Sequence, residues 1–199
     1  MEYISHRVNS VAELKKLSNE YGVELDLRDN INGKIYISHN PFEPGEDFED
    51  YLQEYCHGTM ILNIKSERIE HKIIQLLKKY KISKYFFLDS SFPMIKLLSD
   101  SGENNLALRF SEYEGLDTIY NMRGKAKWVW IDCFTKLPIN YNNYLQLKEW
   151  GYSLCMVSPE LQGQPEKIKE YANYLKANGI QCDSICTKNY NIDTWKKYC

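Results

Sequence analysis

The sequence has no long apolar run, no leader-like N-terminus and no strong excess of charge of either sign. No apolar run is long enough to cross a bilayer, and the chain enters a strand-like segment at Tyr3 without the pattern of a signal peptide. The 25 basic and 27 acidic residues leave a formal net charge of −2, which argues against a general nucleic-acid or membrane-surface binder. We therefore expect no nucleic-acid partner and no stable membrane anchor.

The chain has six cysteines: Cys56, Cys133, Cys155, Cys182, Cys186 and Cys199. They include no Cys-x-x-Cys pair, and four of them fall in strand-like segments. Buried free thiols in a reducing compartment explain this pattern best, with disulfides or a zinc site as the alternatives. We expect a cytoplasmic protein.

Strand-like and helix-like patterns alternate along the whole chain. Strand-like runs begin near Tyr3, Val23, Thr59, Tyr85, Leu106, Trp128, Tyr152 and Cys182. Such alternation predicts a parallel sheet, and eight repeats predict an α/β fold that closes as a compact (β/α)8 TIM barrel over residues 1–199, a single domain. An open doubly wound sheet is the alternative. The segment 34–39 reads as an extra hairpin arm, followed by an acidic helix near residues 46–55.

Polar residues line one face of the predicted strands. From Val23 onward, the apolar positions Val23, Leu25 and Leu27 alternate with Glu24, Asp26 and Arg28. The charge-bearing faces of the next strands hold Asn63 with Lys65, Phe87 with Asp89, Ala107 with Arg109, and Trp130 with Asp132. In a barrel this face is the lumen, where unpaired charges cost several kcal/mol each. These charged side chains therefore either pair with one another in a purely structural network or bind a metal or ligand.

The residue types favour phosphodiester chemistry. Carboxylates spaced like Glu24 and Asp26 supply oxygen ligands for Mg²⁺ or Ca²⁺. Arg7 and Lys65 would neutralise a phosphoryl group.

Two histidines, His6 and His39, could act as base and acid on opposite sides of phosphorus. Four further residues are candidates for contact with the substrate, with ion pairing or packing as the alternative: Arg109, Glu112, Asp132 and Trp130.

The order of these motifs resembles the phospholipase C-like phosphodiesterase superfamily, and more closely glycerophosphodiester phosphodiesterases and bacterial phosphatidylinositol phospholipase C-like barrels. The similarity rests on His6-Arg7 after the first strand, Glu24-Leu25-Asp26 on the second, His39 after a turn, and Asn63-Ile64-Lys65 on the third.

The resemblance implies an acid/base pair, His6 and His39, and a divalent metal held by Glu24 and Asp26. Asn63 stands where the family has a third carboxylate ligand; its neutral amide oxygen can still coordinate the metal, but the site loses a charge. The family mechanism is attack on phosphorus by a neighbouring substrate hydroxyl, which expels the alcohol and leaves a cyclic phosphate.

Sequence alone thus predicts a metal-dependent phosphodiesterase acting on a small glycerol- or polyol-type phosphodiester. The lost carboxylate motivates one alternative, a phosphotransfer or lyase step on a sugar-phosphate or nucleotide-linked intermediate of surface-glycan synthesis. A non-catalytic binding barrel is the other.

Overall fold

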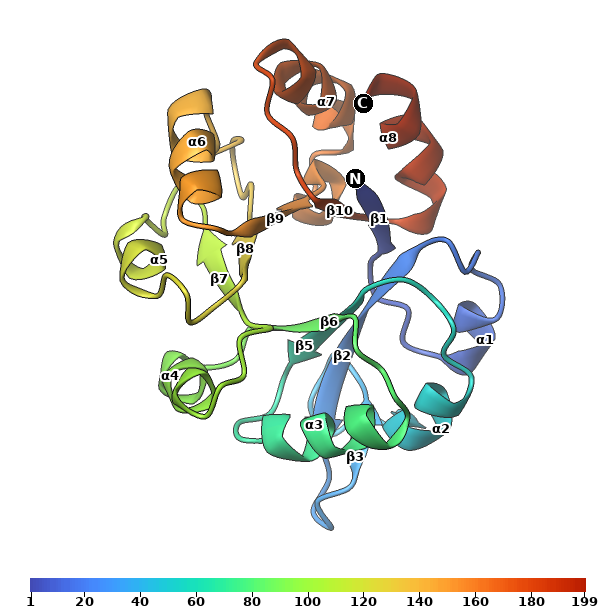
Figure 1. Cartoon of the computed structure of the whole chain (residues 1–199). Coiled ribbons are helices and arrows are strands. Elements are labelled where there is room, and N and C mark those ends of the chain that lie inside the picture. The colour runs from blue at the N-terminus through green and yellow to red at the C-terminus, as the bar shows by residue number, and fades with distance from the viewer.

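Eight parallel strands form a ring with the helices outside it (Figure 1) in the computed structural model, which describes residues 1–199. The ring strands are β1 (Glu2–Ser5), β2 (Gly22–Asp29), β5 (Met60–Ile64), β6 (Tyr85–Leu88), β7 (Ala107–Phe110), β8 (Trp128–Ile131), β9 (Ser153–Val157) and β10 (Ser184–Thr187). The first and last of these, β1 and β10, pair in parallel over four residues. The predicted (β/α)8 architecture is confirmed.

One seam of the ring has almost no backbone ladder. Strands β6 and β7 meet through a single parallel bridge between Phe87 and Leu106 and a 2.8 Å hydrogen bond from the Phe87 N–H to the Asn105 carbonyl. Every other neighbouring pair in the ring has a regular parallel register.

The helices follow the strands in chain order: α1 (Val11–Leu14), α2 (Phe48–Gln53), α3 (Glu70–Lys79), α4 (Phe92–Asp100), α5 (Asp117–Asn121), α6 (Tyr141–Glu149), α7 (Ile168–Ala177) and α8 (Ile192–Tyr198). Apolar residues on their inner faces and on the outer faces of the strands form one core cluster of 43 buried residues. This burial, proportional to apolar area removed from water, is the main source of stability.

The first helix, α1, is a single turn. Ser10 caps it by accepting a hydrogen bond from the Glu13 N–H, and the helix ends at Leu14. Gly22 begins β2. A Cβ atom at Gly22 would lie 2.4 Å from the Thr59 carbonyl oxygen, so close strand packing requires a glycine there.

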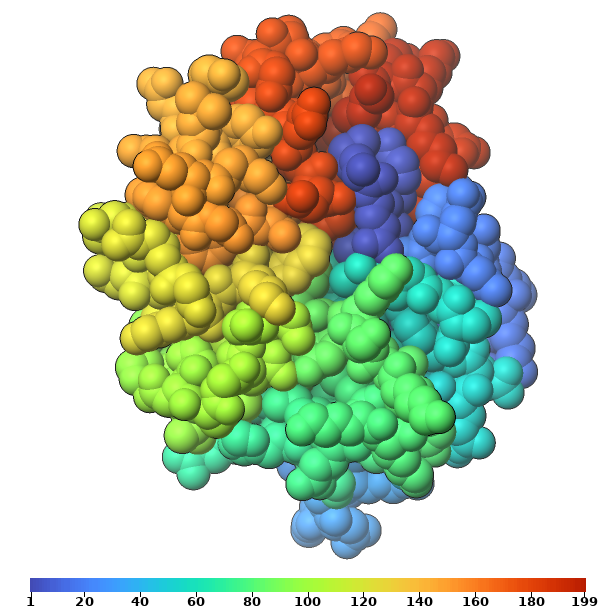
Figure 2. Space-filling model, in the orientation of Figure 1, coloured from blue at the N-terminus to red at the C-terminus, as the bar shows by residue number.

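Nine buried residues form a second cluster, inside the ring: Ile4, Ile61, Phe86, Leu88, Ala107, Trp130, Cys155, Val157 and Cys186. We call the end of the lumen at the carboxyl ends of the parallel strands its upper end. On the face shown in Figure 2, surface atoms cover the middle of the ring.

The predicted facing of the fourth ring strand was wrong, because Phe86 and Leu88 point into the lumen and Phe87 packs in the outer core. Asp89, the next residue, has φ of +60°. This left-handed conformation, rare for a residue with a side chain, interrupts the alternation of the strand, and the Asp89 carboxylate reaches the lumen cations Lys65 and Arg109.

Strand β2 extends beyond the ring as the predicted arm. Its last residues pair antiparallel with β3 (Ile35–Ile37), and Arg28 lies opposite Tyr36. Strand β4 (Glu46–Asp47) then pairs with β3. The tip of this arm protrudes from the body at the lower edge of Figure 2.

The six cysteines are free thiols, four of them buried, in agreement with the sequence. None of the helices has the length and apolar character that crossing a membrane requires.

Candidate active site

Glu24 and Asp26 point into the upper lumen from the middle of β2, and both are buried. The Glu24 carboxylate accepts hydrogen bonds from the backbone N–H of Arg7 at 2.7 Å and from Nδ2 of Asn63 at 2.8 Å. Burial, followed by the negative charge of Asp26, raises the pKa of Glu24 above its ordinary value. The pair therefore needs positive charge nearby to stay ionised.

Cations and one amide surround Asp26. Arg7 Nε and Lys65 Nζ each lie 3.5 Å from its carboxylate. Asn9 holds it from both sides: its Nδ2 donates to Asp26 Oδ2 at 2.9 Å, and its Oδ1 accepts from the Asp26 N–H at 3.0 Å. Two predicted phosphate ligands, Arg7 and Lys65, thus lie at the predicted carboxylate pair.

His6 follows β1 and faces Glu24, with 3.6 Å between Nε2 and Glu24 Oε2. Its Nδ1 is buried and has no hydrogen-bond partner. Burial, together with the positive charges of Lys188, Arg7 and Lys65, lowers the pKa of His6 to about 3. The imidazole is therefore neutral near pH 7, the state that a general base requires.

His39 lies at the end of the β2–β3 arm and is exposed. Its Nδ1 is 2.8 Å from Asn40 Oδ1. Arg28 holds the backbone beneath it, because Nη2 donates to the His39 carbonyl at 2.9 Å and Nη1 donates to the Lys65 carbonyl at 2.8 Å. His39 also contributes to the lowered pKa of His6, so the two histidines lie near enough to interact electrostatically.

A second set of charged residues, Asp89, Arg109 and Asp132, lies across the lumen from β2. Arg109 binds Asp89 at 2.7 Å through Nη2 and Asp132 at 2.7 Å through Nη1, and Asp89 lies 3.7 Å from Lys65. Trp130 donates its indole N–H to Asp132 at 3.3 Å. Three of the four further candidates therefore join one network with the predicted phosphate ligand Lys65.

The remaining candidate, Glu112, makes different contacts. Its Oε1 accepts from the hydroxyl of Thr135 at 2.8 Å and from the Lys136 N–H at 3.4 Å, so it ties the loop after β8 to the loop after β7. It forms no hydrogen bond or ion pair with the other predicted site residues.

The oxygen atoms around Asp26 suit a hard cation, although no group of three His, Cys, Asp or Glu side chains gathers there. Asp26 and Asn63 are neighbours in the β2–β5 register, and each has one buried oxygen, Oδ1, without a hydrogen-bond donor. Glu24, Asp26 and Asn63 would thus supply the oxygen ligands that Mg²⁺ and Ca²⁺ prefer.

Sequence reasoning assigned no role in the site to three residues that shape it, Asn9, Arg28 and Gln162. Asn9 lies in the loop after β1, and Gln162, in a short 3₁₀ turn, donates to Asp132 Oδ1 at 2.7 Å. The parity of β2 placed Arg28 on the polar face and could have marked it as a site residue. No sequence pattern marks a loop residue such as Asn9 or Gln162.

Comparison with known proteins agrees with this architecture. No family model matches the sequence, and no curated protein matches it. Among solved structures, a glycerophosphodiester phosphodiesterase from Agrobacterium tumefaciens superposes with a TM-score of 0.66 at 14% identity, covering 94% of each chain. A glycerophosphoryl diester phosphodiesterase from Parabacteroides distasonis gives a TM-score of 0.68 at 11% identity, covering 98% of this chain and 86% of the other.

The chain therefore has the TIM-barrel fold of these solved glycerophosphodiester phosphodiesterases. At these identities the likeness defines the fold, and the arrangement of its own polar residues carries the argument on function.

Proposed function

We propose that the protein is a phosphoric diester hydrolase that cleaves a small glycerol- or polyol-type phosphodiester with a divalent metal, Mg²⁺ or Ca²⁺, and two histidines. One observation carries this proposal. A neutral histidine, two buried carboxylates and two cations meet at the upper end of β1, β2 and β5, where the active sites of barrel enzymes form.

The cations bind the phosphate in this proposal. Lys65 and Arg7 form ion pairs with Asp26 and would also bind the phosphoryl oxygens of the substrate. A metal held by Glu24, Asp26 and Asn63 would add further positive charge against the developing negative charge of the transition state. Arg109, Asp132 and Trp130 would contact the substrate from the far wall of the lumen.

His6 is the base. Its Nε2, which faces the Glu24 carboxylate at the site, would take the proton of a substrate hydroxyl next to the phosphate. That oxygen forms a bond to phosphorus while the bond to the alcohol breaks, which gives a cyclic phosphate. The departing oxygen takes a proton from Nε2 of His39, whose Nδ1 faces Asn40. Water then opens the ring by the reverse proton transfers.

The first test is hydrolysis of glycerophosphodiesters with Mg²⁺, Ca²⁺ or Mn²⁺, followed by phosphorus NMR. We expect metal-dependent turnover that His6→Ala and Asp26→Ala abolish. Absence of turnover with every diester, in protein shown to be folded, would reject the proposal.

Asn63 favours a second candidate, because a site with one carboxylate fewer holds its metal more weakly, and the second, hydrolytic step would then be lost. In that case the enzyme is a lyase, and the cyclic phosphate accumulates as the final product instead of being hydrolysed.

A further inference from the structure

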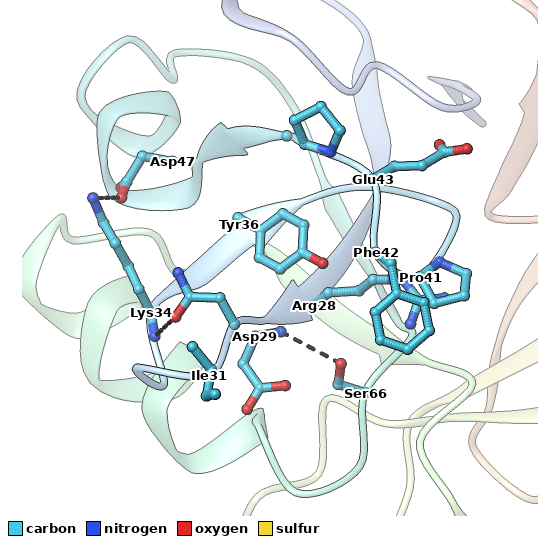
Figure 3. A pocket seen from close by; sticks show the side chains of 13 residues that line it. Arg28, Asp29, Ile31, Lys34, Tyr36, Pro41, Phe42, Glu43, Asp47 and Ser66 are labelled. Carbon is cyan, nitrogen blue, oxygen red and sulfur yellow. Dashed lines mark hydrogen bonds and ion pairs between the residues drawn. The ribbon is translucent and has the colours of Figure 1, made fainter.

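A large cavity of about 1010 Å³ lies on the β2–β3 arm, outside the barrel lumen. We call it the arm cavity. Its walls are the end of β2 at Arg28 and Asp29, the β3 residue Tyr36, the loop 41–45 and Ser66 (Figure 3). None of the catalytic steps above uses it.

The inner wall of the arm cavity belongs also to the catalytic site. Arg28, on the same face of β2 as Glu24 and Asp26, lines the cavity and donates hydrogen bonds to the carbonyls of His39 and Lys65. Ser66 follows Lys65 directly, and the loop 41–45 begins two residues after His39. An alcohol that leaves towards His39 therefore departs on the side of this cavity.

The lining has polar acceptors and flat apolar surfaces. Two carboxylates, Asp29 and Glu43, have no cation partner, and the Tyr36 hydroxyl makes no hydrogen bond within the protein. In Figure 3 the Tyr36 ring lies across the middle of the cavity, between Lys34 and Phe42. Carboxylates and a phenol accept hydrogen bonds from hydroxyl groups, and aromatic faces pack on the C–H faces of a ring.

Phe42 has two features that the fold itself does not explain. Its side chain is fully exposed, at 102% of the reference area, and its φ of +64° is unfavourable for a residue with a Cβ atom. A strained backbone that presents an apolar ring to solvent indicates a contact made with something outside the chain.

We propose that the arm cavity binds the leaving alcohol of the phosphodiester, and that this alcohol is a polyhydroxylated ring of inositol or hexose size. The inference rests on the proposed function. A glycerol or ethanolamine group would fill only a small part of this volume, whereas cavities of this size hold larger ligands. Phe42 would pack on the ring, and Asp29, Glu43 and Tyr36 would bind its hydroxyls.

The test compares two glycerophosphodiesters that differ only in the leaving alcohol, glycerophosphoinositol and glycerophosphoethanolamine. We expect kcat/KM to be about tenfold or more higher for the inositol ester, a difference that corresponds to about 1.4 kcal/mol. Phe42→Ala and Asp29→Asn should each lower this ratio at least about threefold, in keeping with the worth of one aromatic or hydrogen-bond contact. The control is Tyr174→Ala, an exposed aromatic residue on α7, which should leave the ratio unchanged.

Binding of free myo-inositol, measured by saturation-transfer NMR, separates this inference from the proposed function. If no diester is hydrolysed, the proposed function fails, but transfer that Phe42→Ala removes still supports a polyol site. Turnover with the same substrate ratio in wild type and Phe42→Ala would overturn the inference and leave the function intact. A preference for ethanolamine that Asp29→Asn removes would overturn the polyol assignment in favour of a cationic alcohol.

Discussion

Asp26 and Asn63 lie opposite each other across the parallel β2–β5 pair, and the Oδ1 atom of each is buried without a hydrogen-bond donor. Lys65 Nζ lies 3.5 Å from Asp26 Oδ1, but neither oxygen accepts a hydrogen bond, which is costly for buried acceptors. A metal ion between these side chains would bind both oxygens.

The first prediction concerns the charge at this position. Asn63→Asp restores a third negative ligand, and we expect it to raise the affinity for Ca²⁺ or Mg²⁺ about tenfold or more, since ligand charge is a main determinant of affinity at oxygen sites. Calorimetric titration of the protein measures this directly. Asn142→Asp, at an exposed position of α6, should bind as wild type does; equal affinities in all three proteins would argue against a metal at Asn63.

The two histidines should respond differently to the leaving group. His39→Ala should lower turnover of glycerophosphoglycerol about 10²- to 10⁴-fold, the usual worth of a general acid. It should affect the p-nitrophenyl ester of glycerol phosphate much less, because p-nitrophenolate leaves without a proton. His6→Ala should impair both substrates, since each needs the base. Equal losses for the two substrates in His39→Ala would exclude His39 as the acid.

Stability on the acid side should depend on His6. Its pKa lies near 3 in the folded protein against 6.5 for an ordinary histidine, so the unfolded chain binds more protons between these values. The free energy of unfolding should therefore fall as the pH falls through this window.

Urea melts at several pH values, in EDTA and followed by tryptophan fluorescence, measure this slope. The slope attributable to His6 should disappear in His6→Asn and persist in His71→Asn, which changes an exposed histidine of α3. Glu24, with a raised pKa, acts in the opposite direction. The comparison between the two variants therefore isolates His6, and identical slopes in both would contradict the neutral state assigned to it.

Arg109 should matter for stability as well as for binding. Arg109→Met leaves Asp132, a carboxylate only 2% exposed, without its cation. The loss should be about 2 kcal/mol, less than for a fully buried pair, because Arg109 is 30% exposed. Adding Asp132→Asn removes the orphaned charge and should restore part of that loss. Urea denaturation of the single and double variants checks this, and a double variant no more stable than Arg109→Met would refute the explanation.

The sequence predicted the barrel and the carboxylate pair because both depend on local periodicity. Glu24 and Asp26 alternate with Val23, Leu25 and Leu27, so their side of the strand follows from parity alone. Periodicity also led to the wrong facing of Phe86 and Phe87, since the charge on Asp89 suggested a polar face for the whole strand. The positive φ of Asp89, which ends the alternation, is a backbone property that the sequence does not display.

Loop residues were beyond sequence reasoning for a different reason. Asn9 reaches Asp26 across 17 positions and Gln162 reaches Asp132 across 30, so their partners depend on how the barrel closes. The arm was predicted, but the cavity on it arises only when β3 folds back on β2 and places Tyr36 opposite Arg28.

The seam between β6 and β7 gives the charged network a second role. Asp89 follows β6 and Arg109 lies on β7, so their ion pair spans the one place where the ring lacks a regular ladder. At this seam the ion pair helps to hold β6 and β7 together, as backbone hydrogen bonds do between the other neighbouring strands. An anion that draws Arg109 away from Asp89 would therefore weaken the contact between β6 and β7.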